Sequence, residues 1–86
     1  MNIEDKVLNV IEKPINDLGI IVKEVKYEKE NGTSYLRIYI DKEPFVNLDD
    51  CVTVTNLVNP ILDENDFIEE SYILDISSIE KGGKNE

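Results

Sequence analysis

The sequence predicts an α+β domain, a two-layer sandwich in which two helices cover one face of a three-stranded mixed sheet. Three observations predict it. Apolar residues recur at helical spacing in two segments, alternating apolar and polar residues mark three strands, and an Asn-Gly pair joins two of the strands. The expected order is helix, strand, strand, helix, strand. At 86 residues we expect one domain over residues 1–78 and a flexible tail over residues 79–86.

The first helix is expected over residues 3–18. Its apolar side chains recur every three or four residues and form one stripe, which consists of Ile3, Val7, Leu8, Ile11, Ile15 and Leu18. Pro14 lies inside this pattern and is expected to kink the helix. Gly19 follows the last apolar residue and is typical of a left-handed C-terminal cap.

The first strand is expected over residues 20–29, followed by a tight turn at Asn31-Gly32. Its apolar residues change phase after Val22. Either a β-bulge near Lys23-Glu24 restores a single core face, or the strand is buried on both sides.

The second strand is expected over residues 34–41. The aliphatic residues Leu36, Ile38 and Ile40 alternate along it and should face the helices. The opposite face carries Tyr35, Arg37 and Tyr39. Aromatic residues around an arginine are common at protein interfaces, but they can also pair across strands and simply cover an open sheet.

The second helix is expected over residues 48–62. Asn47 is a good N-cap, and Asp50 three residues later completes a capping-box pattern. Asp49 and Asp50 lie in the first turn, where the helix dipole favours anions, so this acidic pair is not expected to be catalytic. The expected buried stripe consists of Leu48, Cys51, Val54, Thr55, Val58, Ile61 and Leu62.

Residues 63–70 form an acidic connection to a third strand over residues 71–78. Asp63 begins a pattern similar to a calcium loop, but Phe67 takes the third ligand position and Leu74 replaces the bidentate glutamate, so no metal is expected. The third strand is expected to run parallel to the second through a helical crossover and to lie beside the first. The predicted strand order is therefore 2-1-3.

Charge is distributed unevenly along the chain. Residues 1–42 hold eight acids and seven bases, whereas residues 43–80 hold ten acids and no Lys or Arg. An anionic surface repels nucleic acid and attracts basic proteins, although it can also serve solubility alone. The chain has no His and one Cys, so neither an enzyme nor a cofactor is expected. The single Cys and the lack of a signal peptide or membrane span predict a cytoplasmic protein.

Several motifs resemble the N-terminal domain of the bacterial ribosome maturation factor RimP family. Gly19 stands at the helix exit, Val25-Lys26-Tyr27 is similar to V-E-Y, and Ile61-Leu62-Asp63 is similar to L-L-D. The longer matches are Leu36–Lys42 with L-R-V-Y-I-D-K, Val46–Cys51 with V-T-L-D-D-C, and Tyr72–Ser78 with Y-x-L-E-V-S-S. Order and spacing agree over residues 3–78.

This resemblance implies a non-enzymatic assembly factor that binds the small (30S) ribosomal subunit, assists its maturation and contacts a basic ribosomal protein near the decoding region. The family continues with a P-G-L-D-R-P-L-like linker and an SH3-like barrel, which are expected to be absent because Ser78 is followed by Ile79-Glu80-Lys81-Gly82-Gly83. The alternative is a stand-alone RNA- or protein-binding adaptor. We expect a monomer whose candidate partner-binding residues are Tyr35, Arg37, Tyr39, Asp63, Glu64, Asp66, Glu69 and Glu70.

Overall fold

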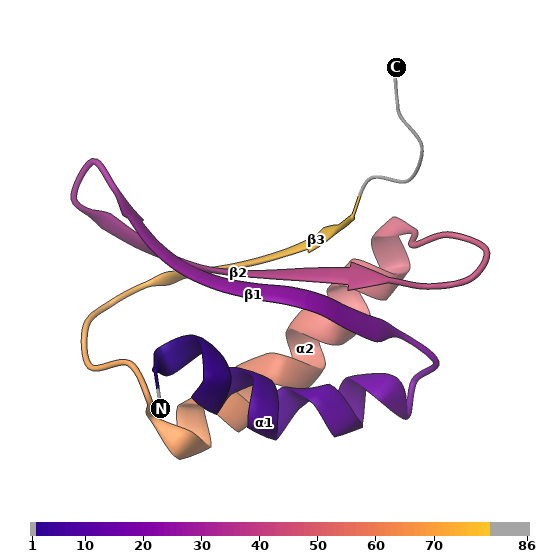
Figure 1. Cartoon of the computed structure of the whole chain (residues 1–86), viewed down its shortest axis with the longest axis horizontal. Coiled ribbons are helices and arrows are strands. Elements are labelled where there is room, and N and C mark those ends of the chain that lie inside the picture. The colour runs from indigo at the N-terminus through magenta and orange to yellow at the C-terminus, as the bar shows by residue number, and fades with distance from the viewer. Residues whose placement is uncertain (1, 80–86) are drawn as a thin grey trace.

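The computed structural model describes residues 2–79 and has the two expected layers (Figure 1). The elements are α1 Ile3–Asn16, β1 Ile21–Glu30, β2 Thr33–Asp41, α2 Leu48–Asn65 and β3 Ile73–Ser78. Both helices lie on the same face of the sheet, with α1 packed along β1 and α2 beside it. The predicted fold class is confirmed. Within the described residues, no helix is both long and apolar enough to span a bilayer.

The strand order differs from the prediction. The observed order is β1-β2-β3, so β2 and not β1 is the central strand, and the predicted order 2-1-3 is wrong. β3 does run parallel to β2, but it pairs with β2 directly, from Tyr35 opposite Ile73 to Ile40 opposite Ser78. The physical reason lies in the outer edge of β1, which is interrupted by the bulge and whose Tyr27 N–H donates to Glu4 of α1.

The β1–β2 hairpin has the expected turn and the expected bulge. Asn31 and Gly32 both adopt positive φ angles, 52° and 81°, which an Asn-Gly turn tolerates. The register of β1 shifts between Val22 and Glu24, so the bulge predicted near Lys23-Glu24 is confirmed. The shift brings Val22 and Val25 onto the face that meets the helices, opposite Ile40 and Ile38.

The core lies between the sheet and the helices. β2 supplies its centre, because Leu36, Ile38 and Ile40 are all fully buried. The other buried apolar residues are Val7, Ile11, Ile15, Ile20, Val22, Val54, Val58, Leu62 and Ile68. Of the expected α1 stripe, Leu18 is 44% exposed, since the helix ends at Asn16 and the following turn leaves the core.

α2 begins with the predicted capping box and runs further than predicted. The Asn47 side chain accepts from the Asp50 N–H at 2.8 Å, and the Asp50 carboxylate accepts from the Asn47 N–H at 3.0 Å. Leu48 was expected in the buried stripe, but it is 84% exposed because the first residue of the helix projects past the edge of the core. The helix continues through Pro60, which is exposed, and ends at Asn65 instead of Leu62.

The predicted tail, residues 79–86, lies outside the described residues apart from Ile79. The Ile79 N–H donates to the Ile40 carbonyl at 3.0 Å, which extends the β2–β3 ladder by one hydrogen bond.

The central role of β2 can be tested by cavity formation. Ile38→Ala removes a fully buried side chain from the central strand and should lower the free energy of unfolding by about 2–5 kcal/mol. The matched control is Ile73→Ala on β3, because Ile73 is 49% exposed; its cost should stay below about 1 kcal/mol. Urea denaturation followed by circular dichroism measures both. Equal losses for the two variants would contradict the assigned core.

Candidate protein-binding site

The C-terminal end of α2 concentrates negative charge. Because the helix reaches Asn65, Asp63 and Glu64 lie in its last turn, and Asp66 caps it in a left-handed conformation with φ 51°. The Asp66 N–H donates to the Leu62 carbonyl at 2.8 Å. No basic residue lies in this turn. Three carboxylates thus add to the negative end of the helix dipole, an arrangement that is unfavourable in the isolated domain.

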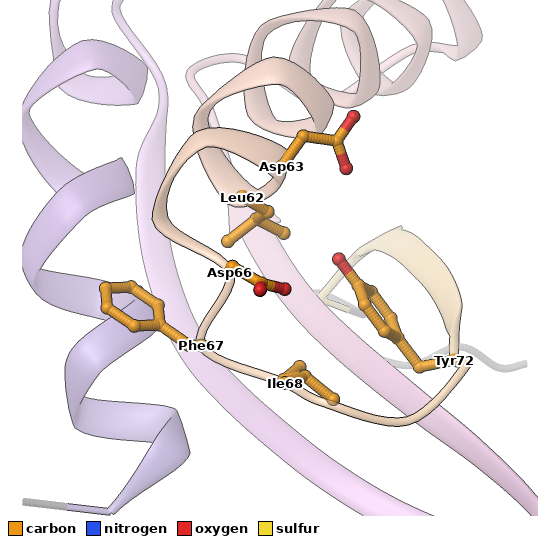
Figure 2. A pocket seen from close by; sticks show the side chains of 6 residues that line it. All are labelled: Leu62, Asp63, Asp66, Phe67, Ile68 and Tyr72. Atoms are coloured by element: carbon orange, nitrogen blue, oxygen red, sulfur yellow. The ribbon is translucent and has the colours of Figure 1, made fainter.

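A small pocket opens beside this helix end. It has a volume of about 80 Å³ and is lined by Leu62, Asp63, Asp66, Phe67, Ile68 and Tyr72. Figure 2 shows Leu62, Ile68, Asp66 and Tyr72 turned toward the same space, whereas Phe67 points toward α1. Burial, together with the carboxylates of Asp63 and Asp66, raises the pKa of Tyr72, so its phenol stays protonated. The pocket combines apolar walls with anionic groups, which suits the stem and head of a lysine or arginine.

Glu70 has a different role from its acidic neighbours. Its carboxylate accepts hydrogen bonds from the Tyr27 and Ser34 hydroxyls, the latter at 3.0 Å, and lies 3.3 Å from the Lys29 ammonium. These contacts join the segment before β3 to the β1–β2 hairpin. The hydrogen bond from Tyr27, followed by those from Ser34 and Lys29, holds the pKa of Glu70 below its usual range. Glu70 is therefore an anchor within the fold, and binding a partner is not required to explain it.

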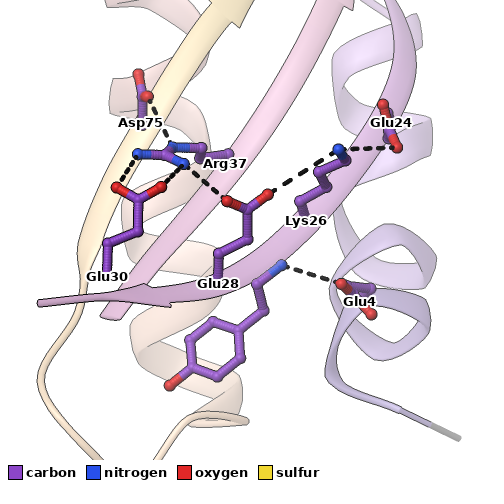
Figure 3. A network of polar contacts seen from close by, with 8 residues as sticks. Glu4, Glu24, Lys26, Glu28, Glu30, Arg37 and Asp75 are labelled. Atoms are coloured by element: carbon purple, nitrogen blue, oxygen red, sulfur yellow. Dashed lines mark hydrogen bonds and ion pairs between the residues drawn. The ribbon is translucent and has the colours of Figure 1, made fainter. Parts of the chain in front are cut away.

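Arg37 is likewise engaged within the fold. It lies at the centre of the sheet face that the helices leave open, where its guanidinium is 2.8 Å from Glu28, 3.3 Å from Glu30 and 3.5 Å from Asp75 (Figure 3). It also lies over the Tyr35 ring, 4.6 Å from the centroid. Its side chain is only 20% exposed. These contacts tie all three strands together and favour cross-strand pairing over a free binding surface.

Apart from Glu70, whose contacts lie within the fold, the other seven candidate residues form two separate groups. Tyr35, Arg37 and Tyr39 are half-buried on the open sheet face, opposite the helices. Asp63, Glu64, Asp66 and Glu69 are exposed at the end of α2 and in the segment after it. The structure does not bring the two groups together into one site.

Two features of the surface were missed by the sequence analysis. Tyr72 lines the acidic pocket, which the alternation of Tyr72, Leu74 and Ile76 could have suggested because it puts all three on the helix-facing side. Phe45, Leu48 and Val52 form exposed apolar surface around the start of α2, with exposures of 62%, 84% and 57%. Of these three residues only Leu48 was predicted to belong to the buried stripe of α2, and no local signal in the sequence indicates that it is exposed.

The structure offers no support for chemistry at Cys51. Burial, with the nearby charges of Asp50 and Asp75, raises the pKa of the Cys51 thiol, whereas an activated cysteine nucleophile needs a lowered pKa. Among residues 2–79 no cluster of three or more potential ligands could hold a metal ion.

The Glu70 anchor makes stability depend on pH. A carboxylate whose pKa falls on folding stabilises the protein above its unfolded-state pKa, about 4.3 for Glu, and this contribution is lost as the pH drops through the folded-state value. Glu70→Gln should therefore be less stable than wild type at pH 7, and the difference should shrink below about pH 4.3. Urea unfolding at a series of pH values measures the difference.

The matched control for this experiment is Glu69→Gln, because the neighbouring Glu69 side chain is exposed and makes no polar contact with the described residues. Its stability should follow that of wild type across the series. A difference between wild type and Glu70→Gln that stays constant from pH 7 to pH 3 would show that the Glu70 carboxylate does not stabilise the fold through its charge.

One comparison with known proteins bears on the identity of the chain. The sequence model of the family described as the RimP N-terminal domain matches residues 10–79. The match runs from the middle of α1 to the residue after β3, and it includes the central strand, the capping box and the acidic end of α2. This agreement over most of the chain shows that the protein belongs to the RimP N-terminal domain family of ribosome maturation factors.

Proposed function

We propose that this chain assists maturation of the small (30S) ribosomal subunit in the cytoplasm by binding a basic ribosomal protein near the decoding region. The proposed contact is the acidic end of α2, defined here as Asp63, Glu64, Asp66 and Glu69. Membership of a ribosome maturation family supports the general role. The specific surface is supported by the electrostatics of the domain itself.

The observation that carries the proposal is the contrast between satisfied and unsatisfied carboxylates. Asp50, Glu70 and Asp75 each have a cation within 3.5 Å in the fold. The four side chains of the acidic end of α2 have no ion-pair partner among the described residues, although three of them, Asp63, Glu64 and Asp66, lie at the negative end of the helix dipole. A cationic side chain from a partner would relieve this repulsion, so binding gains energy that the free domain lacks.

Direct RNA binding is less well supported. Residues 2–79 contain seven basic side chains, and five of them, Lys13, Lys26, Lys29, Arg37 and Lys42, lie within ion-pair distance of a carboxylate. Few cations therefore remain to neutralise a phosphate backbone, which is the main source of nucleic-acid affinity. The proposed partner is for this reason a protein.

The proposal predicts salt-sensitive binding to purified small ribosomal subunits. The variant D63N/E64Q/D66N/E69Q keeps the side-chain shapes but removes four charges, and Asn at position 66 still tolerates the left-handed cap. Since one exposed ion pair contributes roughly 0.2–1 kcal/mol, binding should weaken about tenfold or more and lose most of its salt dependence. Fluorescence anisotropy of the labelled chain at low and moderate KCl concentrations measures both effects.

The matched control is E12Q/D17N/E24Q/D49N, which changes the net charge equally at exposed positions on other surfaces. It should bind nearly as well as wild type. If both variants lose the same affinity, the net charge of the chain matters and the acidic end of α2 does not. If the wild type binds ribosomal RNA at least as tightly as intact subunits, the proposed protein partner is wrong.

A further inference from the structure

The two edges of the sheet differ in how well they are protected against pairing with another strand. The β1 edge carries many charged side chains and the bulge, both of which oppose strand addition. Its charged residues are Lys23, Glu24, Lys26, Glu28, Lys29 and Glu30. In addition, the Tyr27 N–H on β1 donates to the Glu4 carboxylate of α1 at 3.0 Å (Figure 3). The β1 edge is therefore closed to another strand.

The β3 edge has none of these protections within the described part of the chain. β3 lies at the other end of the sheet and pairs with β2 at six consecutive positions without a shift in register. Asp75 is its one charged residue, and that side chain turns to Arg37 on the open face. A regular edge with little charge is a template for a further strand.

The hydrogen bonds of β3 identify which backbone groups are free. The Ile79 N–H donates to the Ile40 carbonyl, and Ile40 pairs with Ser78. Because successive residues of a strand direct their backbone groups to opposite sides, Asp75 and Ser77 also bond to β2. Leu74, Ile76 and Ser78 therefore direct their N–H and C=O groups away from the sheet, and no described residue pairs with them.

A groove runs beside this edge on the side of α2. Its volume is about 510 Å³, and its lining residues are Thr55, Asn59, Asp63, Glu70, Ser71, Tyr72 and Leu74. The first three form one stripe along α2, whereas Leu74 belongs to β3. Its two carboxylates are Asp63, which has no ion-pair partner among the described residues, and Glu70, which lies 3.3 Å from the Lys29 ammonium; none of its seven lining residues is basic. A strand added to β3 would direct every second side chain toward this groove, where lysine or arginine fits the charge.

We propose that β3 accepts an extended segment of a basic protein as a fourth strand, with alternate Lys or Arg side chains entering the groove beside α2. This inference rests on the proposed function, from which it takes the basic charge of the partner. It adds that the partner binds in an extended conformation and that β3 is the strand that receives it. Asp63 belongs both to the groove and to the acidic end of α2, so the two surfaces are continuous.

The charge of the protein argues against a second copy as the occupant. Each chain carries a net charge of −10, and the lining of the groove includes Asp63 and Glu70 but no basic residue. Pairing β3 with β3 of another copy would bring these carboxylates together without a compensating base. A cationic segment at the same edge would instead be attracted by these carboxylates.

The test uses a peptide of five Lys-Thr repeats and hydrogen exchange of the full chain measured by NMR. Binding as a fourth strand should slow exchange of the Leu74, Ile76 and Ser78 amides at least about tenfold at saturating peptide. The Asp75, Ser77 and Ile79 amides serve as internal controls, since they already bond to β2 and should change less. The same peptide methylated on its central backbone nitrogens keeps every charge but cannot complete the ladder, and it should bind much more weakly.

Matched substitutions provide a second measurement. Ser78→Pro removes an outward N–H at an exposed position where an edge strand tolerates proline, whereas Ser78→Ala keeps the N–H. The proline variant should bind the peptide at least about fivefold more weakly than the alanine variant. Unchanged exchange at Leu74, Ile76 and Ser78, or equal affinity of the methylated peptide, would overturn strand addition. Protection that rises with protein concentration in the absence of peptide would show that a second copy occupies the edge, which also overturns it.

The outcomes separate this inference from the proposed function. If the peptide protects the β3 amides while wild type fails to bind small subunits, strand addition stands and the proposed partner is wrong. If subunits bind and the charge variant D63N/E64Q/D66N/E69Q weakens that binding, but the amides stay unprotected with both peptide and subunits, the acidic surface stands and strand addition is wrong.

Discussion

Burial of the aliphatic side of β2 is the interaction on which the rest of this fold depends. Leu36, Ile38 and Ile40 lose all contact with water because β1 and β3 flank them and two helices cover them. A domain of this size buries a modest fraction of its surface. Three fully buried side chains in one strand are therefore a large part of its core. The position of every other element follows from covering this one strand.

The opposite side of β2 shows how one cation can organise an open sheet face. Arg37 contacts carboxylates from β1 and β3 and leaves their combined charge only partly neutralised. The Glu70 carboxylate contacts Tyr27, Ser34 and Lys29 in the same way, and joins the segment before β3 to the β1–β2 hairpin. Both networks therefore use carboxylates to hold parts of the fold together. Asp63, Glu64, Asp66 and Glu69, at the end of α2 and just after it, remain outside these networks. These four carboxylates are close together along the chain and have no ion-pair partner among the described residues.

Local patterns predicted most of the fold, and nonlocal competition explains what they missed. The Asn47–Asp50 capping box, the Asn31-Gly32 turn and the bulge after Val22 were all predictable because each depends on a few adjacent residues. The strand order was not, since either strand of the hairpin could have received β3. The bulge and charges of β1 disfavour it as a partner, but the hydrogen bond from the Tyr27 N–H to Glu4 of α1 joins distant residues and no local pattern indicates it.

The candidate site shows the same division. The acidic character of residues 63–70 was visible in the sequence, but the separate role of Glu70 was not, because its partners Tyr27 and Ser34 are distant along the chain. Exposure of Leu48 was also unpredictable, since helical spacing gives the direction of a side chain and not the extent of the sheet below it. Predicting that Arg37 lies among three carboxylates would have required the register of all three strands.

The central place of β2 also has a consequence for biosynthesis. Chains emerge from the ribosome from the N-terminus onward, and β2 acquires its second neighbour only when Ile73 and the residues after it have been made. In a nascent chain that has formed only the hairpin and α2, the edge of β2 that later pairs with β3 is therefore still unpaired. The β2–β3 ladder joins residues that are distant along the chain, from Tyr35 with Ile73 to Ile40 with Ser78, so the sheet is completed only after β3 has been made. A chain of a ribosome maturation family thus exposes part of its own core until β3 has left the ribosome.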